Sequence, residues 1–534
     1  MKTIKNFLLP AAGLVAAISG LAGTRPVNMD RWTSAVPCTK HANAAETIVD
    51  AFGGTTGAEM GPTNGLNQSS GEVVYGTVTN QAAADSLAEA TPGPDQASTT
   101  VPPLFQEVFS FSLQDYWCEN HLSVADIDGD GLQDIVLMAT GLATTNGPPW
   151  SYRCRAILLH AEKDGTFTDS VITNFPGQYG YGAVTADLNN DGAVDLILRE
   201  QSATHVLLND GHGSFHEVWT GQPGYYNLAV ADVNHDGFLD IISGTQTRSG
   251  GLIEVFTNNG TGTSFEKTWQ SRFYGSGEDS IETVLAVNLN NDGEIDIAAR
   301  EIYSGLLVTL LGNPSGTFVQ KDVLALGDRT FALAGGRVNG DAVTDLAACV
   351  GWGQVRVWVT QGDGSLSNYW QSPNLGQAAL NLALADFDQD GFDDIFVGTF
   401  GDGALRIYRN NPGVGFDLWW QGSIPGVGYT GSVADINGDG YPDLIVGERD
   451  RIRILINQTG VPRITHLALA DGAATVTWTA LPEKSYRVQF KLHLDDPEWT
   501  DLSGDVKAST SSASTTDSTV GPGSQRFYRV IKLP

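Results

Sequence analysis

The segment Asp232-Val-Asn-His-Asp-Gly-Phe-Leu-Asp240, followed directly by the apolar pair Ile241-Ile242, decides the fold. Acidic or amide residues stand at its first, third, fifth and ninth positions, and glycine stands at the sixth. Side chains with this spacing in a tight loop converge on one point, and the glycine permits the sharp turn. The segment therefore predicts a cation-binding loop that leads straight into a β-strand.

The same pattern, Asp-x-Asp/Asn-x-Asp-Gly-x-x-Asp, occurs in seven copies that begin 45 to 61 residues apart, the spacing of propeller blades. We number them loop one to loop seven; they begin at Asp126, Asp187, Asp232, Asn288, Arg337, Asp386 and Asp435. Loop four begins with an amide. Loop five departs further, because Arg337 takes its first position and Ala342 replaces the glycine, although Asn339, Asp341 and Asp345 remain.

Each period also holds four short strands, expected in the third period at residues 227–233, 240–243, 253–257 and 266–270. Repeats of this kind bury both faces of every sheet only by packing blade on blade in a ring. The seventh period lacks its fourth strand, whereas a spare strand, residues 105–112, precedes the first period. We therefore predict an all-β, seven-bladed β-propeller over residues 104–460, with residues 105–112 as the outer strand of the last blade.

An all-oxygen, carboxylate-rich loop suits a hard cation, and its flexibility favours Ca²⁺ over Mg²⁺. The six complete loops hold 19 of the 61 acidic residues, and carboxylates gathered in this way repel one another without a cation. We predict about six structural Ca²⁺ sites. The predicted ligands are Asp126, Asp128, Asp130, Asp134, Asp187, Asn189, Asp191, Asp195, Asp232, Asn234, Asp236, Asp240, Asn288, Asn290, Asp292, Asp296, Asp386, Asp388, Asp390, Asp394, Asp435, Asn437, Asp439 and Asp443. The alternative is a turn rich in Asp and Asn without metal, and this is the preferred interpretation of loop five.

These loops, each followed by an apolar strand, resemble the FG-GAP or VCBS repeat, the unit of the integrin α-chain propeller, of bacterial surface proteins and of some fungal lectins. The resemblance covers about 350 residues. It implies a calcium-stabilised propeller that binds its ligand on the face away from the metals. Loop five departs from the family pattern at two positions.

The segments outside the repeat have their own patterns. Lys2 and Lys5 precede an apolar run, so residues 1–22 are expected to be an export signal, cleaved there or as late as residue 44; an uncleaved anchor helix is the alternative. Residues 45–103 are low in complexity and are interpreted as a linker. Residues 463–534 alternate as strands and look like a small β-sandwich similar to fibronectin type III.

Composition narrows the class of protein. The net charge of -31 argues against nucleic acid and against an anionic membrane surface. No later segment is apolar enough to predict a membrane span. Of the four cysteines, Cys118 and Cys154 could pair or remain separate buried thiols, and Cys349 is expected in the core; Cys38 completes the set.

The loops that end the strands opposite the predicted metals collect aromatic and charged residues, which suit sugar rings or a protein partner. The aromatic residues are Trp150, Tyr152, Tyr179, Tyr181, Tyr225, Tyr226, Tyr274, Tyr303 and Trp352; the charged pairs are Arg199-Glu200, Arg300-Glu301 and Glu448-Arg449. The chain carries neither Gly-x-Ser-x-Gly nor His-Glu-x-x-His. We expect a secreted or cell-surface binding or adhesion module for a glycan or protein, and not an enzyme. The alternatives are a polysaccharide lyase that uses the Arg-Glu pairs and a purely structural surface protein.

Overall fold

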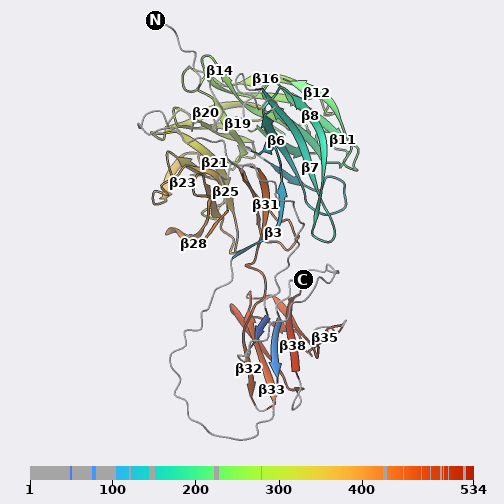
Figure 1. Cartoon of the computed structure of the whole chain (residues 1–534). Helices are drawn as coiled ribbons and strands as arrows, with labels where there is room; N and C mark the ends of the chain where they lie inside the picture. The colour runs from blue at the N-terminus through green and yellow to red at the C-terminus, as the bar shows by residue number, and fades with distance from the viewer. Residues whose placement is uncertain are drawn as a thin grey trace, which may run out of the picture. The chain divides into compact units, whose positions relative to one another are not determined.

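A computed structural model describes residues 48–50, 75–79 and 104–533, apart from gaps at 119–121, 143–150, 222–227, 278, 425–429, 449, 471, 482, 494–495, 497, 503 and 521–524. The predicted export signal, its cleavage sites and Cys38 lie outside the described residues. Every regular element of the described residues is a β-strand (Figure 1). In the described part of the chain, no helix is long and apolar enough to cross a membrane.

Within the described residues, residues 104–457 form seven antiparallel sheets of the predicted kind, which we call blades one to seven. Blade one contains β5 (Ser123–Ala125), β6 (Asp134–Leu142), β7 (Tyr152–Ala161) and β8 (Phe167–Pro176), with the short β4 (Tyr116–Trp117) also paired to β6. Blade two contains β9 (Gly180–Ala186), β10 (Asp195–Glu200), β11 (Thr204–Asn209) and β12 (Phe215–Gly221). Blade three contains β13 (Leu228–Ala231), β14 (Asp240–Thr247), β15 (Gly250–Asn258) and β16 (Phe265–Gln270).

The later blades repeat the same order. Blade four contains β17 (Ile281–Val287), β18 (Asp296–Glu301), β19 (Leu306–Asn313) and β20 (Thr317–Ala325). Blade five contains β21 (Thr330–Gly336), β22 (Asp345–Val350), β23 (Gln354–Thr360) and β24 (Leu366–Gln371). Blade six contains β25 (Ala379–Ala385), β26 (Asp394–Thr399), β27 (Ala404–Asn411) and β28 (Gly415–Ser423). Blade seven contains β29 (Thr430–Ala434), β30 (Asp443–Gly447), β31 (Arg451–Asn457) and β3 (Phe105–Ser112).

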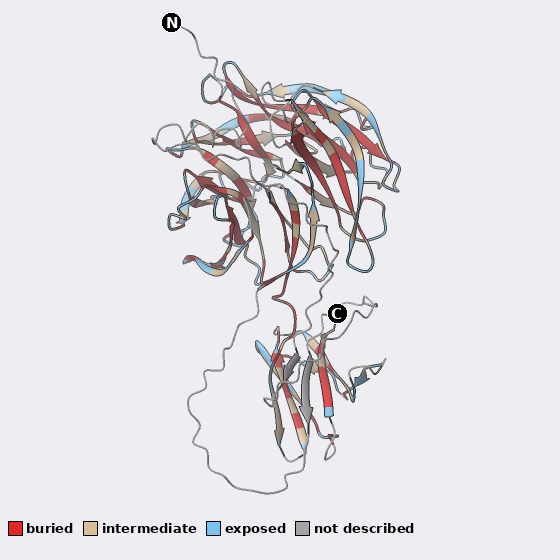
Figure 2. Ribbon diagram, viewed as in Figure 1, coloured by how far each residue is buried: buried red, intermediate tan, exposed pale blue. Residues whose placement is uncertain are grey.

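Apolar residues on alternate faces of each second strand join one blade to the next. In β10, Leu196 and Leu198 belong to a buried cluster shared with blade one, whereas Ile197 packs against blade three. Seven such clusters link the blades in order, and the last joins Ile445 of blade seven to Ile135 of blade one. The clusters therefore close a ring of seven blades. Figure 2 shows buried residues along the inner strands and exposed residues concentrated on the outer ones.

The ring closes where the two ends of the repeat region meet. Strand β3 pairs antiparallel with β31, with Phe105 opposite Asn457 and Ser112 opposite Arg451. This confirms that residues 105–112 supply the outer strand of the last blade. The phenyl ring of Phe105 lies 4.9 Å from the indole of Trp420 and 5.8 Å from the ring of Phe387, both in blade six or its loop. The first strand of the region thus holds blades six and seven together.

The C-terminal residues form a separate β-sandwich. One sheet contains β32 (Ile464–Ala470), β33 (Ala473–Thr479) and β37 (Ser512–Asp517). The other contains β34 (Ser485–Lys491), β35 (Thr500–Asp501), β36 (Val506–Lys507) and β38 (Gln525–Lys532), with β1 (Ile48–Asp50) and β2 (Tyr75–Thr79) at its edge. Trp478, Tyr486 and Tyr528 fill the core between the sheets. Two stretches of the expected linker thus supply strands, since the free edge of β38 offers hydrogen-bonding groups to β2.

The closing strand can be tested with Phe105→Ala. Phe105 is 3% exposed, so we expect the free energy of unfolding to fall by about 3–5 kcal/mol through the lost packing and the cavity. The control is Val108→Ala in the same strand, because Val108 is 51% exposed and its loss should cost little. Urea denaturation of the full chain measures both variants. Equal stability of the two would contradict the closure of blade seven by β3.

Candidate metal-binding loops

The backbone of the predicted loops is nearly uniform. The fourth position has a positive φ in all seven loops, including four that are not glycine: Asn190, His235, Asn291 and Gln389, with φ between 56° and 59°. The sixth position is a glycine with φ between 88° and 96° in every loop except loop five. Residues other than glycine adopt a positive φ only at a cost in conformational free energy. The shared positive φ at positions four and six therefore shows that six loops have the same backbone shape.

In the five loops that begin with aspartate, the first-position carboxylate accepts hydrogen bonds from the backbone of its own loop. In loop two, Asp187 accepts hydrogen bonds from the backbone N–H groups of Asp191 (3.2 Å) and Gly192 (2.9 Å). Asp232, Asp386 and Asp435 accept the same pair of bonds, and Asp126 accepts from Gly129 and Gly131. These bonds fix the orientation of the first-position carboxylate within its loop. In loop one the carboxylate oxygens of Asp126, Asp128 and Asp130 lie within 4.8 Å of one another.

The ninth-position aspartate opens the second strand of every blade and is fully buried. The seven are Asp134, Asp195, Asp240, Asp296, Asp345, Asp394 and Asp443, each 0% exposed. One carboxylate oxygen accepts the N–H of loop position two, as from Val233 to Asp240 at 3.1 Å. The other accepts an N–H from the third strand, as from Asn258 to Asp240 at 2.8 Å. The side chain therefore ties the loop to two strands.

Burial raises the pKa of these aspartates. Burial raises the pKa of Asp240 to about 6, that of Asp443 to about 7 and that of Asp394 to about 8, and neighbouring carboxylates add to the shift. Backbone hydrogen bonds to the carboxylates oppose the rise. A divalent cation among these carboxylates would offset both the burial and the repulsion, so the donor set fits the Ca²⁺ that the pattern predicts.

Loops four and five depart from this geometry. In loop four, the amide oxygen of Asn288 accepts from the N–H of Asn291 at 2.7 Å, and its nitrogen donates toward the carbonyl of Ala342 at 3.4 Å. In loop five, the N–H of Arg337 donates to the carboxylate of Asp393 in loop six at 2.6 Å. Loop five offers no carboxylate at its first position, and its lack of metal stays a prediction.

A set of asparagines that the sequence reasoning missed joins neighbouring loops. Four buried asparagines lie at the end of the third strands of blades two, three, six and seven, three as the last residue and Asn410 one residue before it: Asn209, Asn258, Asn410 and Asn457. The side-chain nitrogen of Asn258 donates to the carbonyl of Leu188 in the previous loop at 2.7 Å and to that of Leu239 at 3.1 Å. The other three make the equivalent pairs of bonds. In the sequence, these four asparagines could have been recognised by their position just before a turn that contains glycine.

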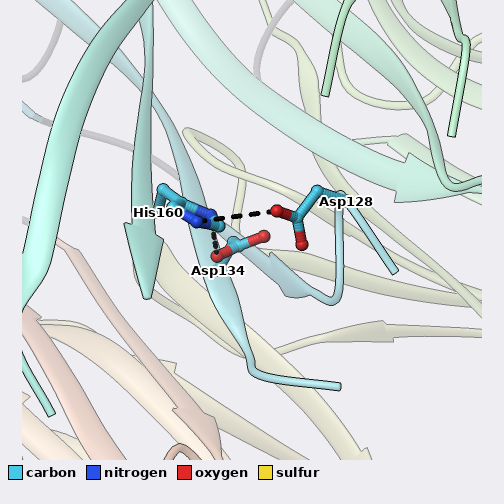
Figure 3. Close-up of side chains that lie close together, drawn as sticks. All are labelled: Asp128, Asp134 and His160. Carbon is cyan, nitrogen blue, oxygen red and sulfur yellow. Dashed lines mark hydrogen bonds and ion pairs between the residues drawn. The ribbon is translucent and has the colours of Figure 1, made fainter. Parts of the chain in front are cut away.

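Two loops receive a basic side chain from the third strand. In loop one, His160 of β7 lies against Asp134 and Asp128 (Figure 3). In loop six, Arg409 of β27 lies 2.5 Å from Asp388 and 3.6 Å from Asp390. These are the two loops with aspartate at all four ligand positions. A nitrogen-bearing side chain of the third strand therefore lies against the two loops with the most carboxylates.

At the end of the blades opposite the aspartate loops, several of the aromatic residues expected to form a binding face are buried. Tyr179, Tyr181 and Tyr274 are 2–4% exposed, so these aromatic residues close blade ends. Trp150, Tyr225, Tyr226 and Arg449 lie outside the described residues. Tyr152 and Tyr303 are half-buried, and Trp352, at 52%, is exposed. This end also holds Phe273, which is 49% exposed.

The described members of the charged pairs are buried. Arg300 donates to Thr283 and to the carbonyl of Thr330 and forms an ion pair with Glu282 at 3.2 Å. Glu301 accepts from the backbone N–H groups of Tyr303 and Ser304, and burial raises its pKa to about 7. Arg199, Glu200 and Glu448 are also buried, at 1–5% exposed. These hydrogen-bond and ion-pair partners of Arg300 and Glu301 thus lie within the propeller itself.

The three cysteines among the described residues, Cys118, Cys154 and Cys349, are buried. Cys154 and Cys349 carry free thiols, and burial raises the pKa of both to about 12. No bond joins Cys154 to Cys118, so the interpretation as separate thiols is correct. Cys349 lies in the core between blades five and six, as expected.

The asparagine bridges can be tested with Asn258→Ala, which leaves the carbonyls of Leu188 and Leu239 without their donor. Because both carbonyls are shielded, we expect a loss of about 1–3 kcal/mol in the free energy of unfolding. Asn259→Ala is the control, since the adjacent Asn259 is exposed and bonds only within its own turn. Denaturant titration measures the free energy of unfolding of both variants. A loss no greater than that of Asn259→Ala would refute the role of the bridges.

Comparison with known protein families supports the repeat. A model described as the FG-GAP-like repeat matches residues 126–198, 187–243, 232–299, 337–397 and 386–446. A search of curated proteins found no match. Among solved structures, the chain is similar to one titled "Crystal structure of BBS1N in complex with ARL6DN, soaked with lead", with 12% sequence identity, a TM-score of 0.44 and coverage of 66% of this chain and 97% of the other. Because the matched repeats span more than half of its residues, the chain belongs to the family of FG-GAP-like repeat proteins.

Proposed function

We propose that this protein is an exported, calcium-stabilised propeller that binds a glycan or an extracellular protein through the face opposite its metal loops. The expected export rests on the sequence of residues 1–22. The resemblance of the C-terminal sandwich to fibronectin type III, a prediction from its strand pattern, is in keeping with an extracellular protein.

The calcium part of the proposal is supported by the loop geometry. In loop one, carboxylate oxygens at positions one, three and five lie within 4.8 Å of one another, and a buried aspartate stands at position nine of every loop. Hard oxygen donors in a flexible loop favour Ca²⁺. In this role the ion neutralises clustered carboxylates and stabilises the end of each blade.

Chelation tests the calcium sites. If free Ca²⁺ is 100 times its Kd, each site adds about 2.7 kcal/mol to the free energy of unfolding, so the melting temperature should fall on treatment with a chelator and recover with calcium. Elemental analysis of calcium-saturated protein should find about six ions per chain. Asp435→Ala in loop seven should remove one ion, whereas Asp341→Ala in loop five should remove none. An unchanged melting temperature with chelator would sink the proposal.

The binding part rests on one observation: the two exposed large aromatic side chains among the described residues, Trp352 and Phe273, lie at the same end of the blades. The other exposed large apolar residues are aliphatic and lie on outer strands, in a turn at the metal end or in the sandwich. Trp352 stands in the turn between β22 and β23, and Phe273 stands between β16 and β17. Exposed aromatic rings supply apolar area and a stacking face at little conformational cost.

Ring contacts and a backbone hydrogen bond hold the residues around Trp352 in place. The ring of Phe331 lies 5.9 Å from that of Trp352 in an edge-to-face arrangement. The N–H of Gly351 donates to the carbonyl of Arg329 at 2.7 Å, and the guanidinium of Arg329 lies 5.0 Å from the ring centre of Tyr303. Flat rings beside a guanidinium suit the apolar face and the hydroxyl groups of a sugar.

A glycan array followed by fluorescence titration tests the binding face. We expect Trp352→Ala to weaken binding of an identified glycan at least tenfold, since truncation of an aromatic anchor commonly costs about 2 kcal/mol. Leu418→Ala is the matched control, because Leu418 is 51% exposed but lies on the outer strand β28. Both variants should retain the calcium content of the parent. Equal affinity of the two variants would place the binding site elsewhere. If the ligand is a protein instead of a glycan, its affinity for the same two variants should be compared.

A further inference from the structure

Loop one differs from the other loops in the side chain that its third strand presents to it. His160 immediately precedes Ala161, whose N–H binds the ninth-position aspartate, Asp134. The equivalent residues of loops two to seven are Leu208, Thr257, Leu311, Val359, Arg409 and Ile456. Loop one therefore combines aspartate oxygens with an imidazole.

Hydrogen bonds determine which imidazole nitrogen faces the loop. Nδ1 of His160 lies 3.1 Å from Oδ1 of Asp134. That carboxylate already accepts the backbone N–H of Ala161 at 2.7 Å and that of Ile127 at 3.0 Å. Because this carboxylate accepts hydrogen bonds, we assign the hydrogen to Nδ1; in the neutral ring Nε2 then carries the lone pair. Figure 3 shows the ring of His160 with a dashed contact to each of Asp134 and Asp128.

The remaining nitrogen has the position of a metal ligand. Nε2 lies 3.5 Å from Oδ2 of Asp128. Two ligands at about 2.1 Å from one tetrahedral ion stand about 3.4 Å apart, close to this separation. Asp126 and Asp130 each bring an oxygen within 4.8 Å of a carboxylate oxygen of Asp128. A histidine that binds metal through one nitrogen and donates its other N–H to a carboxylate is a common arrangement, since the carboxylate orients the ring.

We propose that loop one is a mixed nitrogen–oxygen site for a divalent cation of the Co²⁺ and Zn²⁺ type, with Nε2 of His160 and the carboxylates of Asp128 and its loop neighbours as ligands. Imidazole binds such ions well, whereas Ca²⁺ prefers oxygen. Asp134 orients His160. This inference rests on the proposal that the loops bind metal, and it gives one of them a different ion.

Loop six supplies an internal control. Arg409 occupies the place of His160 and lies 2.5 Å from Asp388, but a guanidinium has no lone pair to give to a metal. Both loops carry four aspartates and a basic residue from the third strand. Only the loop with the imidazole should therefore select the softer ion.

The test is a Co²⁺ titration of the full chain, first stripped with chelator and then held in millimolar Ca²⁺. The visible absorption of bound Co²⁺ reports nitrogen and oxygen ligands, and we expect one tight Co²⁺ per chain that Zn²⁺ displaces. His160→Leu, which copies Leu208 of loop two, should weaken Co²⁺ binding at least tenfold. Arg409→Leu should leave it unchanged. Thermal melting of both variants confirms that they fold.

The outcomes separate the two proposals. Equal Co²⁺ affinity of His160→Leu and its parent would overturn the inference and leave His160 as an ion-pair partner of Asp128. Failure of Co²⁺ to bind while the remaining loops retain Ca²⁺ would also overturn it, with the calcium proposal intact. Tight Co²⁺ binding that depends on His160, in a protein that retains no Ca²⁺, would uphold the loop-one site and refute structural calcium.

Discussion

The propeller depends on a carboxylate buried at the start of the second strand of each blade. A charged group without solvent is costly unless hydrogen bonds or opposite charge replace the water. Each ninth-position aspartate meets this condition with one N–H from its loop and one from the third strand. The same interaction therefore sets where the loop ends, where the second strand begins and how the third strand aligns with it.

Neighbouring blades are joined both by apolar packing and by polar bonds at the loop end. Buried asparagines bridge blades one to two, two to three, five to six and six to seven. Where blade five follows blade four, Thr360 replaces the asparagine, and the two loops bond directly: the N–H of Thr344 donates to the carbonyl of Asn288 at 2.6 Å. The two loops with the poorest ligand sets thus share a junction held by bonds between the loops themselves.

The two ends of the blades have different chemistry for a topological reason. Every first-to-second strand connection lies at one end, so all the aspartate loops gather there. The connections at the other end vary in length and sequence, as loops that bind ligands commonly do. There the structure separates buried tyrosines and arginine–glutamate pairs, which complete the blades, from Trp352 and Phe273, which remain open to solvent.

The local pattern was enough to predict seven loops, the strands that follow them and the closing role of residues 105–112. These features depend on spacing within a few residues and on the need to bury both faces of each sheet, and both can be read from one segment at a time. The pattern could not show that His160 faces Asp128, that Asn258 reaches the previous loop, or that Arg300 is internal. Those contacts join residues from different strands or blades, so strand register and packing decide them. The exposure of Trp352 and the pairing of β2 with β38 were decided in the same way, because burial and edge pairing are properties of the assembled sheets.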